Sequence, residues 1–375
     1  MRKPWRILAI NPGSTSTKVA LFEGDQALFS VNVTHDAAIL ATFPEISDQL
    51  PYREQTIREQ LEANGFTLDG IDAFAGRGGG LEPLEGGTYP VNDLLLEHAR
   101  TCHTARHPAT LGSQLAHMFA QTTGGKAFVV NPPDVDEFRP VARITGLRDI
   151  LRESRIHALN QKEVGIRYAA SQGRSYIDLN LIICHIGGGV SVTAHQKGRM
   201  IDSNDIVNGD GPMAPTRSGS LPARAVVREC FSGKYTERQM ADRILKDGGL
   251  VDHLGTSDVR EVVARIAAGD EYARLVYDAM IYQIGKSVGA MAAALKGQVD
   301  AVLLTGGIAR DAYLVTALKD QIGFIAPVET LPGEFEMEAL ASGVIRVLDG
   351  VELPRTYTGN PIWPGLDALR KETRG

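Results

Sequence analysis

The chain has 375 residues, of which 43% are hydrophobic and 22% are charged, so it is long enough to form two globular domains. Its net charge of −6 and its few aromatic residues provide no basic surface for nucleic acid. The N-terminal apolar run is too short for a signal peptide or a membrane span, and the three scattered cysteines do not form the pattern of a disulfide framework or a zinc site. We therefore expect a soluble cytoplasmic protein that binds neither nucleic acid nor a membrane.

The first predicted element is a β-hairpin at residues 7–22. Its two apolar runs are separated by a turn that contains Asn11, Gly13 and four consecutive hydroxyl residues. Gly13 permits close approach of a ligand, and the hydroxyl and backbone N–H groups can donate to phosphate oxygens. The turn is not a P-loop, because the G-x-x-x-x-G-K-[ST] pattern is absent and a strand follows instead of a helix. An ordinary polar turn is the alternative interpretation.

A third strand at 27–33 and a helix at 57–64 follow the hairpin, and a short buried strand is predicted at 71–76. This strand delivers Arg77 into the glycines at 78–80. An arginine at a strand end beside flexible glycines can reach an anionic ligand. The alternative for Arg77 is an ordinary surface loop.

Helices at 93–100 and 109–121 precede another strand at 126–130. The four histidines in this region have no carboxylate or cysteine at metal-ligand spacing, so we interpret them as surface or core residues. The strand ends in the acidic segment 131–137, which either holds Mg²⁺ directly or through water, or forms a solvated loop. A helix at 163–171 then leads into the second half of the chain.

A second hairpin at 180–194 repeats the order of the first, with an apolar strand, a glycine turn and another strand. Gly13 matches Gly187 and Gly24 matches Gly198 at the same offset, and each hairpin is followed by a third strand. A duplication over such a long period indicates two related domains, not a solenoid of short repeats.

Arg217 lies at the centre of a loop rich in glycine and proline, residues 208–222. A largely helical region at 223–296 follows. The next segment, 300–310, is predicted to form a strand, a Gly-Gly turn and a helix, whose N-terminus would open toward a ligand. The last predicted elements are a strand at 322–328 and a helix at 336–348.

Six motifs in this order resemble the acetokinase family, and five of them resemble its butyrate kinase branch, within the acetate and sugar kinase/Hsp70/actin superfamily. The motifs are residues 11–18, 77–80, 157–162, 185–189, 217–222 and 332–337. The resemblance implies an α/β fold of two duplicated ribonuclease H-like (actin-like ATPase) domains, each with a mixed five-stranded sheet, and a nucleotide cleft between them. The implied domains are 1–155, to which 346–375 returns, and 156–345.

The resemblance also implies reversible transfer of the γ-phosphoryl group of ATP to a short-chain fatty acid, giving acyl phosphate and ADP with the help of Mg²⁺. The chemistry is consistent with the residues present, because a carboxylate is already ionised at neutral pH and needs no base to attack. It needs cations that overcome its repulsion from the triphosphate. A kinase for propionate or branched-chain acids is one alternative, and a non-catalytic ATP-gated binding protein is another.

By the same resemblance, Arg77 and Arg217 clamp the carboxylate and the phosphoryl group, His185 donates to the phosphoryl group, and His157 supports the site. The implied residues for phosphate and nucleotide are Asn11, Gly13, Ser14, Ser16, Lys18, Gly187, Gly188, Gly189, Gly306, Gly307 and Ile308. The implied residues for Mg²⁺ are Asn131, Asp136 and Glu336.

Two residues depart from the family pattern. Asn131 stands where butyrate kinases usually have an aspartate, so either Asn131 holds Mg²⁺ through water or Asp134 or Asp136 takes over. Thr216 stands where the family tends to have an acidic residue. Family analogy also implies a homo-oligomer, dimeric or higher.

Overall fold

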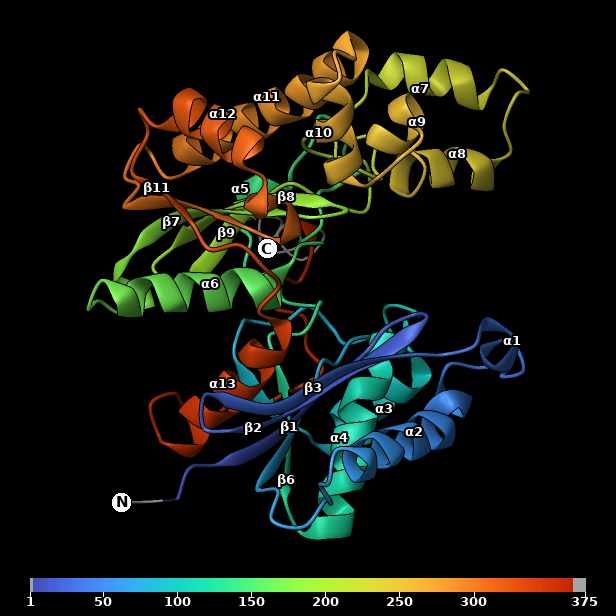
Figure 1. Cartoon of the computed structure of the whole chain (residues 1–375), viewed down its shortest axis with the longest axis vertical. Helices are drawn as coiled ribbons and strands as arrows, with labels where there is room; N and C mark the ends of the chain where they lie inside the picture. The colour runs from blue at the N-terminus through green and yellow to red at the C-terminus, as the bar shows by residue number, and fades with distance from the viewer. Residues whose placement is uncertain (1–2, 367–375) are drawn as a thin grey trace, which may run out of the picture. The chain divides into compact units, whose positions relative to one another are not determined.

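The computed structural model describes residues 3–366, which form two compact units. The first unit contains the described residues up to 136 and those from 335 onward, and the second contains 137–334. Each unit is a mixed β-sheet with helices on both of its faces (Figure 1).

The sheet of the first unit has six strands in the order β3-β2-β1-β4-β6-β5. Strands β1, β2 and β3 are antiparallel, β1, β4 and β6 are parallel, and β5 pairs antiparallel with β6. The strands are β1 (Arg6–Pro12), β2 (Ser16–Glu23), β3 (Gln26–Thr34), β4 (Ala73–Gly76), β5 (Thr88–Pro90) and β6 (Lys126–Val130).

Alternate residues of β1 face opposite sides of this sheet, and both sides are buried. Leu8 and Ile10 belong to a core cluster that includes Leu115 and Phe119 of α4. In Figure 1, α2 and α4 cover one face of the sheet and α13 covers the other. The helices are α1 (Ala37–Leu40), α2 (Leu50–Ala63), α3 (Asp93–Thr101), α4 (Leu111–Thr123) and α13 (Glu336–Leu348), with short 3-10 turns η1 (Ser47–Gln49) and η2 (Pro108–Thr110).

The sheet of the second unit has five strands in the order β11-β10-β7-β8-β9. Strands β7, β8 and β9 are antiparallel, while β7, β10 and β11 are parallel, so the topology repeats that of β1–β4 and β6. This repeat confirms the duplication expected from the two glycine hairpins. The strands are β7 (Asn180–Ile186), β8 (Val190–Gln196), β9 (Arg199–Ser203), β10 (Ala301–Thr305) and β11 (Val328–Thr330).

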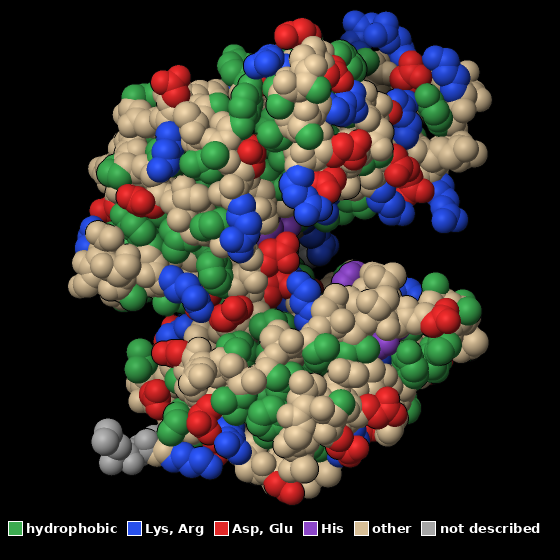
Figure 2. All heavy atoms as spheres, in the orientation of Figure 1, with side chains coloured by type: hydrophobic (Ala, Val, Ile, Leu, Met, Phe, Trp, Pro, Cys, Tyr) green, Lys and Arg blue, Asp and Glu red, His purple; other side chains and the backbone are tan. Residues whose placement is uncertain are grey.

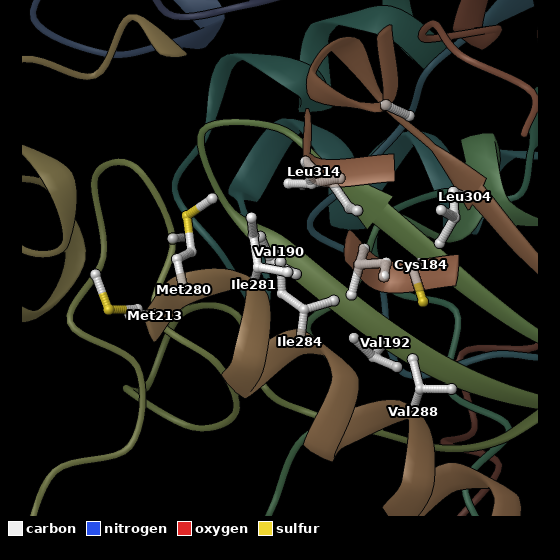
Figure 3. Packing of buried hydrophobic residues seen from close by; sticks show 14 of the residues in the cluster. Cys184, Val190, Val192, Met213, Met280, Ile281, Ile284, Val288, Leu304 and Leu314 are labelled. Carbon is white, nitrogen blue, oxygen red and sulfur yellow. The ribbon is translucent and has the colours of Figure 1, made fainter. Parts of the chain in front are cut away.

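Helix α6 lies on one face of the second sheet, and α11 and α12 lie on the other (Figure 1). Figure 3 shows Val190 and Val192 of β8 facing Ile284 and Val288 of α11, with Leu314 of α12 beside them. The helices are α5 (Pro140–Arg143), α6 (Ala158–Ser171), α7 (Ala223–Cys230), α8 (Glu237–Leu245), α9 (Leu250–Leu254), α10 (Val259–Ala267), α11 (Glu271–Ala294) and α12 (Ala312–Ile322), with 3-10 turns η3 (Tyr176–Asp178) and η4 (Gly307–Arg310).

The boundaries of the two units differ from the expected domains 1–155 and 156–345. Helix α13 belongs to the first unit from its first residue, because it packs on β1, β4 and β6. Residues 137–155 belong to the second unit, where Arg139 N–H donates to Ile201 O at 3.0 Å. Residues 346–366, part of the segment expected to return to the first domain, are grouped with the first unit, and 367–375 lie outside the described residues.

The expectation of five strands in each sheet was wrong for the first unit, which gains β5. This strand has three residues and ends at Pro90, which is tolerated because β5 is an edge strand. The expected strand at 322–328 was also misplaced. Residues up to Ile322 continue helix α12, and β11 begins at Val328.

On the face shown in Figure 2, lysine and arginine side chains are interspersed with aspartate and glutamate. Among residues 3–366, no helix is long and apolar enough to cross a membrane.

The close approach of α13 to β6 gives a test of how the first unit is assembled. A Cβ atom on Gly343 would lie 2.4 Å from Val130 Cγ1, so Gly343→Ala should force the helix away from the sheet and cost about 1–3 kcal/mol of unfolding free energy. Gly289, inside α11, is the matched control, because its Cβ would meet nothing within 4 Å. Gly289→Ala should stabilise the protein by up to about 1 kcal/mol. Urea unfolding measures the unfolding free energy of both variants. Equal unfolding free energies for Gly343→Ala and Gly289→Ala would contradict the close packing of α13 on β6.

Candidate active site

The first unit brings two of the expected site residues, Asn11 and Arg77, to the carboxylate of a third, Glu336 at the start of α13. Asn11 Nδ2 donates to Glu336 Oε2 at 2.7 Å, and Arg77 Nη1 donates to Glu336 Oε1 at 2.8 Å. Asn11 is near the end of β1 and pairs in register with Lys18 of β2. Arg77 directly follows β4, the parallel neighbour of β1. Parallel pairing of β1 and β4 therefore brings the hairpin and the arginine to the same edge of the sheet.

Arg53 was missed in the sequence, although its side chain is fully buried beneath the first hairpin. Its guanidinium donates to Gly13 O at 2.9 Å, Ser16 O at 3.1 Å and Thr17 Oγ1 at 2.9 Å. Burial lowers its pKa to about 10, so the side chain remains charged at neutral pH. The hydrogen bonds of Arg53 thus fix the turn from its buried side, while Ser14 and Thr15 are exposed at its tip. An arginine inside the polar pattern of α2 is the only signal that could have found it.

The electrostatic environment of the first unit's cluster is positive. Burial lowers the pKa of His107, and the charges of Arg77 and Arg53 lower it further. Such an environment favours bound anions.

The residues expected to hold Mg²⁺ have different local roles. Gly87 N–H donates to Asn131 Oδ1 at 2.8 Å, and Asn131 has a left-handed backbone (φ 38°), which asparagine tolerates better than most residues. Asp136 is buried, and in residues 3–366 no group of three histidine, cysteine, aspartate or glutamate side chains is arranged to hold a metal. Carboxylate and amide oxygens are ligands that suit magnesium, so this donor set fits an ion held largely through water.

The second unit places His185 in the middle of its sheet. His185 is in β7, opposite Ser191 of β8 and beside Thr305 of β10. The turn after β7 contains Gly187, Gly188 and Gly189, and Gly187 N–H donates to Gly189 O at 3.0 Å. The corresponding bond in the first hairpin runs from Gly13 N–H to Ser16 O at 2.7 Å. Both hairpins therefore have a turn closed by its own backbone.

His157 and His185 form a stacked pair, with ring centroids 3.9 Å apart and planes inclined by 16°. His157 directly precedes α6. His185 Nδ1 lies 2.9 Å from Asn160 Oδ1, and His157 Nδ1 lies 2.8 Å from Ser191 Oγ. The roles of Asn160 and Ser191 were missed in the sequence, because no motif marks a residue that orients a histidine.

The guanidinium of Arg217 packs directly on the second glycine turn. A Cβ atom on Gly189 would lie 1.7 Å from Arg217 Nη1, so any other residue there would displace the guanidinium. Thr216 fixes the loop, because its hydroxyl donates to Gly188 O at 2.9 Å, which an ionised acid could not do. Arg217 Nε and Nη1 are buried and have no hydrogen-bond partner among residues 3–366. Burial lowers the pKa of Arg217, and the charge of Asp205 opposes that effect.

The segment expected to contact nucleotide has a different shape from the expected strand, turn and helix. Gly306 has φ of 89° and exchanges backbone hydrogen bonds with Gly333 at 3.1 and 3.0 Å. The 3-10 turn η4 then contains Gly307 and Ile308, and α12 begins only afterward. Asp311 caps α12 by accepting from Tyr313 and Leu314 N–H, so its own side chain satisfies these two N–H groups of the helix N-terminus.

The family whose model matches residues 149–325 is described as the Acetokinase family. A relative named probable butyrate kinase 2, from Caldanaerobacter subterraneus subsp. tengcongensis, is 45% identical over 353 residues, which cover 94% of this chain and 99% of the relative. A relative named probable butyrate kinase, from Listeria welshimeri, is 44% identical over 351 residues with the same coverage of both chains.

Two solved structures share the fold. Acetate kinase from Porphyromonas gingivalis has a TM-score of 0.75 at 20% identity, and the match covers 92% of this chain and 100% of that one. A propionate kinase from Francisella tularensis has a TM-score of 0.68 at 18% identity, with coverage of 90% and 98%. These likenesses confirm the expected fold class.

The fully buried His195 on β8 makes the stability of the protein depend on pH. Burial lowers its pKa to about 3, helped by Lys162 and opposed by Glu137, whereas an unfolded histidine has a pKa near 6.5. Below about pH 6.5 this histidine therefore binds a proton in the unfolded chain but not in the folded chain. The unfolding free energy consequently decreases as the pH is lowered. His195→Gln should reduce the loss between pH 7 and pH 5 by about 2 kcal/mol, measured by urea unfolding.

The control is Thr193→Val, which removes a buried hydroxyl from the same strand without removing a titrating group. It should keep the pH dependence of the wild type. If His195→Gln also kept the wild-type pH dependence, His195 would not be the group that causes it.

Proposed function

The chain belongs to the acetokinase family, and we propose that it transfers the γ-phosphoryl group of ATP reversibly to the carboxylate of a short-chain fatty acid, giving acyl phosphate and ADP. Butyrate is the proposed acid, because relatives at 43–45% identity over 94% of the chain are named probable butyrate kinases. Since the reaction uses ATP, we also propose a cytoplasmic location, and family analogy supports a homo-oligomer.

The observation that carries this proposal is the unpaired guanidinium of Arg217. Two of its nitrogens are buried without a hydrogen-bond partner in the described chain, which is costly for a charged group. A buried guanidinium without protein acceptors favours an anionic ligand, and carboxylate and phosphoryl groups are the anions that arginine pairs with best. The burial of Arg217 thus favours a reaction between anions.

The proposed reaction needs no catalytic base, because the attacking carboxylate is already ionised at neutral pH. Its main barrier is the repulsion between the carboxylate and the triphosphate, and cations lower that barrier. We assign Arg77 and Arg217 to this role, with His185 as a donor to the transferring phosphoryl group and His157 as its neighbour. Both arginines would act most strongly in the transition state, where charge develops on the transferred group.

The two hairpins are the proposed phosphate-binding elements. In the first unit, Asn11, Ser14, Ser16 and Lys18 would serve the phosphates, with Gly13 permitting close approach. In the second unit, the glycines 187–189 would do so, and Gly306, Gly307 and Ile308 would lie by the adenosine. When bound, Mg²⁺ would neutralise charge on the phosphates. Glu336 would hold it through water, with Asn131, Asp134 or Asp136 as its further partner.

The reaction can be tested by trapping acyl phosphate with hydroxylamine in the presence of ATP, Mg²⁺ and short acids from acetate to hexanoate, both straight and branched. We expect the highest kcat/KM with butyrate. Neighbouring acids should also react, since one methylene changes binding by only about 1–3 kcal/mol. A preference for propionate or a branched acid would assign the alternative kinase of the same family. Absence of hydroxamate with every acid would favour a non-catalytic ATP-binding protein and would refute the proposed function.

The role of Arg217 predicts a specific kinetic pattern. Arg217→Ala should lower kcat about 10²–10³-fold with little change in ATP affinity, because the lost donors act mainly in the transition state. Arg217→Lys should recover little, since lysine keeps the charge but loses the planar fork. Arg224→Ala, at an exposed position on α7, is the control and should match the wild type. Normal turnover in either Arg217 variant, or only a lower melting temperature, would remove Arg217 from the site.

A further inference from the structure

A chain of hydrogen bonds runs through the second unit from Tyr176 to His157. Tyr176 Oη lies 2.6 Å from His195 Nδ1, and His195 Nε2 lies 2.9 Å from Gln161 Oε1. Gln161 Nε2 donates to Ser191 Oγ at 2.7 Å, and Ser191 Oγ lies 2.8 Å from His157 Nδ1. Gln161, Ser191 and His195 are completely buried, so these bonds do not compete with bulk water.

The orientation of the Gln161 amide gives this chain a direction. Its Nε2 also lies 3.3 Å from the backbone oxygen of Ser191, which can only accept a hydrogen bond. Rotating the amide by half a turn would bring two oxygens together, so Nε2 must face Ser191 and Oε1 must face His195. His195 therefore donates from Nε2 to Gln161, which leaves its Nδ1 to accept from the Tyr176 hydroxyl.

The neutral state of His195 fits this direction. A protonated ring would carry a hydrogen on both nitrogens and could not accept from Tyr176. The ring is fully buried, and Lys162, the residue after Gln161 on α6, forms an ion pair with Glu137 at 2.9 Å between Nζ and Oε2. Burial is the largest cause of the lowered pKa of His195. The charge of Lys162 lowers this pKa further, and the charge of Glu137 raises it.

The same order of donors and acceptors extends along the hydrogen-bond chain to His157. Because Ser191 Oγ accepts from Gln161, its own hydrogen remains to be donated, and His157 Nδ1 is the acceptor at 2.8 Å. A neutral imidazole that accepts at Nδ1 carries its proton on Nε2. His185 has the opposite arrangement, because its Nδ1 faces Asn160 Oδ1 at 2.9 Å and must donate. The two stacked rings therefore differ in tautomer when both are neutral.

We propose that Tyr176, His195, Gln161 and Ser191 are positioning residues that hold neutral His157 with its ring proton on Nε2. The relay makes His157 a hydrogen-bond donor at Nε2 without a positive charge, whereas His185 can donate from Nε2 only as a cation. Fixing one tautomer in advance removes the reorganisation that would otherwise accompany each turnover. The effect on the tautomer is independent of the proposed function, and the effect on turnover rests on it.

The tautomer can be measured directly by NMR of protein labelled with ¹⁵N in the histidine rings. Spectra at about pH 8 lie above the reference histidine pKa of about 6.5, and His157→Gln identifies the His157 signals by their loss. In the wild type, Nδ1 of His157 should resonate as an unprotonated nitrogen and Nε2 as a protonated one. The reverse assignment would overturn the proposal.

Gln161→Glu tests the direction of the relay with almost no change of shape. An ionised carboxylate only accepts, so the Ser191 hydroxyl should turn toward it and offer a lone pair to His157 Nδ1. The proton of His157 should then move to Nδ1, or the ring should become protonated. Ser191→Ala is the second variant and should give a mixture of tautomers, because Gln161 can still donate to the backbone oxygen of residue 191. An unchanged His157 spectrum in both variants would overturn the proposal.

Kinetics separates positioning from simple structural support. Gln161→Glu should lower kcat about 10–100-fold, by analogy with the loss when hydrogen-bond partners of metal-binding histidines are changed, while KM for ATP stays constant. The control is Thr193→Val, on the same face of β8, whose hydroxyl lies 2.8 Å from Ser203 Oγ outside the relay. It should retain the wild-type kcat and tautomer. Normal kcat in Gln161→Glu despite a reversed tautomer would refute the positioning role, whereas a wild type that makes no acyl phosphate would refute only the proposed function.

Discussion

Burying a guanidinium group costs free energy unless other groups compensate its charge. Three arginines of this protein differ in the partners that provide this compensation. Arg53 is fully buried, and neutral oxygens of Gln49, Thr17 and the first hairpin surround its charge, so it serves the architecture. Arg77 has a carboxylate partner, Glu336, at the edge of the first sheet. Arg217 has two buried nitrogens that nothing in the described chain satisfies. Buried polar atoms without a partner are costly, so the incomplete pairing of Arg217 is the feature from which we infer a ligand.

The two units share a topology but differ in the chemistry that they place on it. In both, a strand, a turn closed by its own backbone and an antiparallel return strand form the centre of the sheet. The first unit places hydroxyl and amide side chains at this turn and braces it with a buried cation. The second unit uses bare glycine backbone, which leaves room for Arg217 to lie on Gly189. The two units thus offer equivalent backbone scaffolds that carry different side chains at the turn.

Sequence patterns predicted the elements well wherever a signal was local. The hairpins, β6, α13 and the candidate arginines and histidines all follow from apolar runs, glycines and motif order. The features that the sequence did not predict depend on tertiary contacts. The three residues of β5 are too few to show periodicity, and α13 joins the first sheet because of packing that its own sequence does not reveal. Asn160 and Gln161 lie within the motif 157–162, but their hydrogen bonds reach His185 and His195, which are distant in sequence. Ser191 likewise contacts the distant His157, so the motifs alone do not reveal these roles.

The discontinuity of the first unit has a consequence for the biosynthesis of the protein. Its sheet is complete after residue 130, yet one face is covered only when α13, beginning at Glu336, has been made. Residues 137–334 form a continuous unit and can fold as soon as they leave the ribosome, whereas the N-terminal strands must wait with an apolar face exposed. We therefore expect the second unit to complete its fold before the first. Nascent chains that stop before α13 should accordingly be clients of chaperones that bind exposed β-strands.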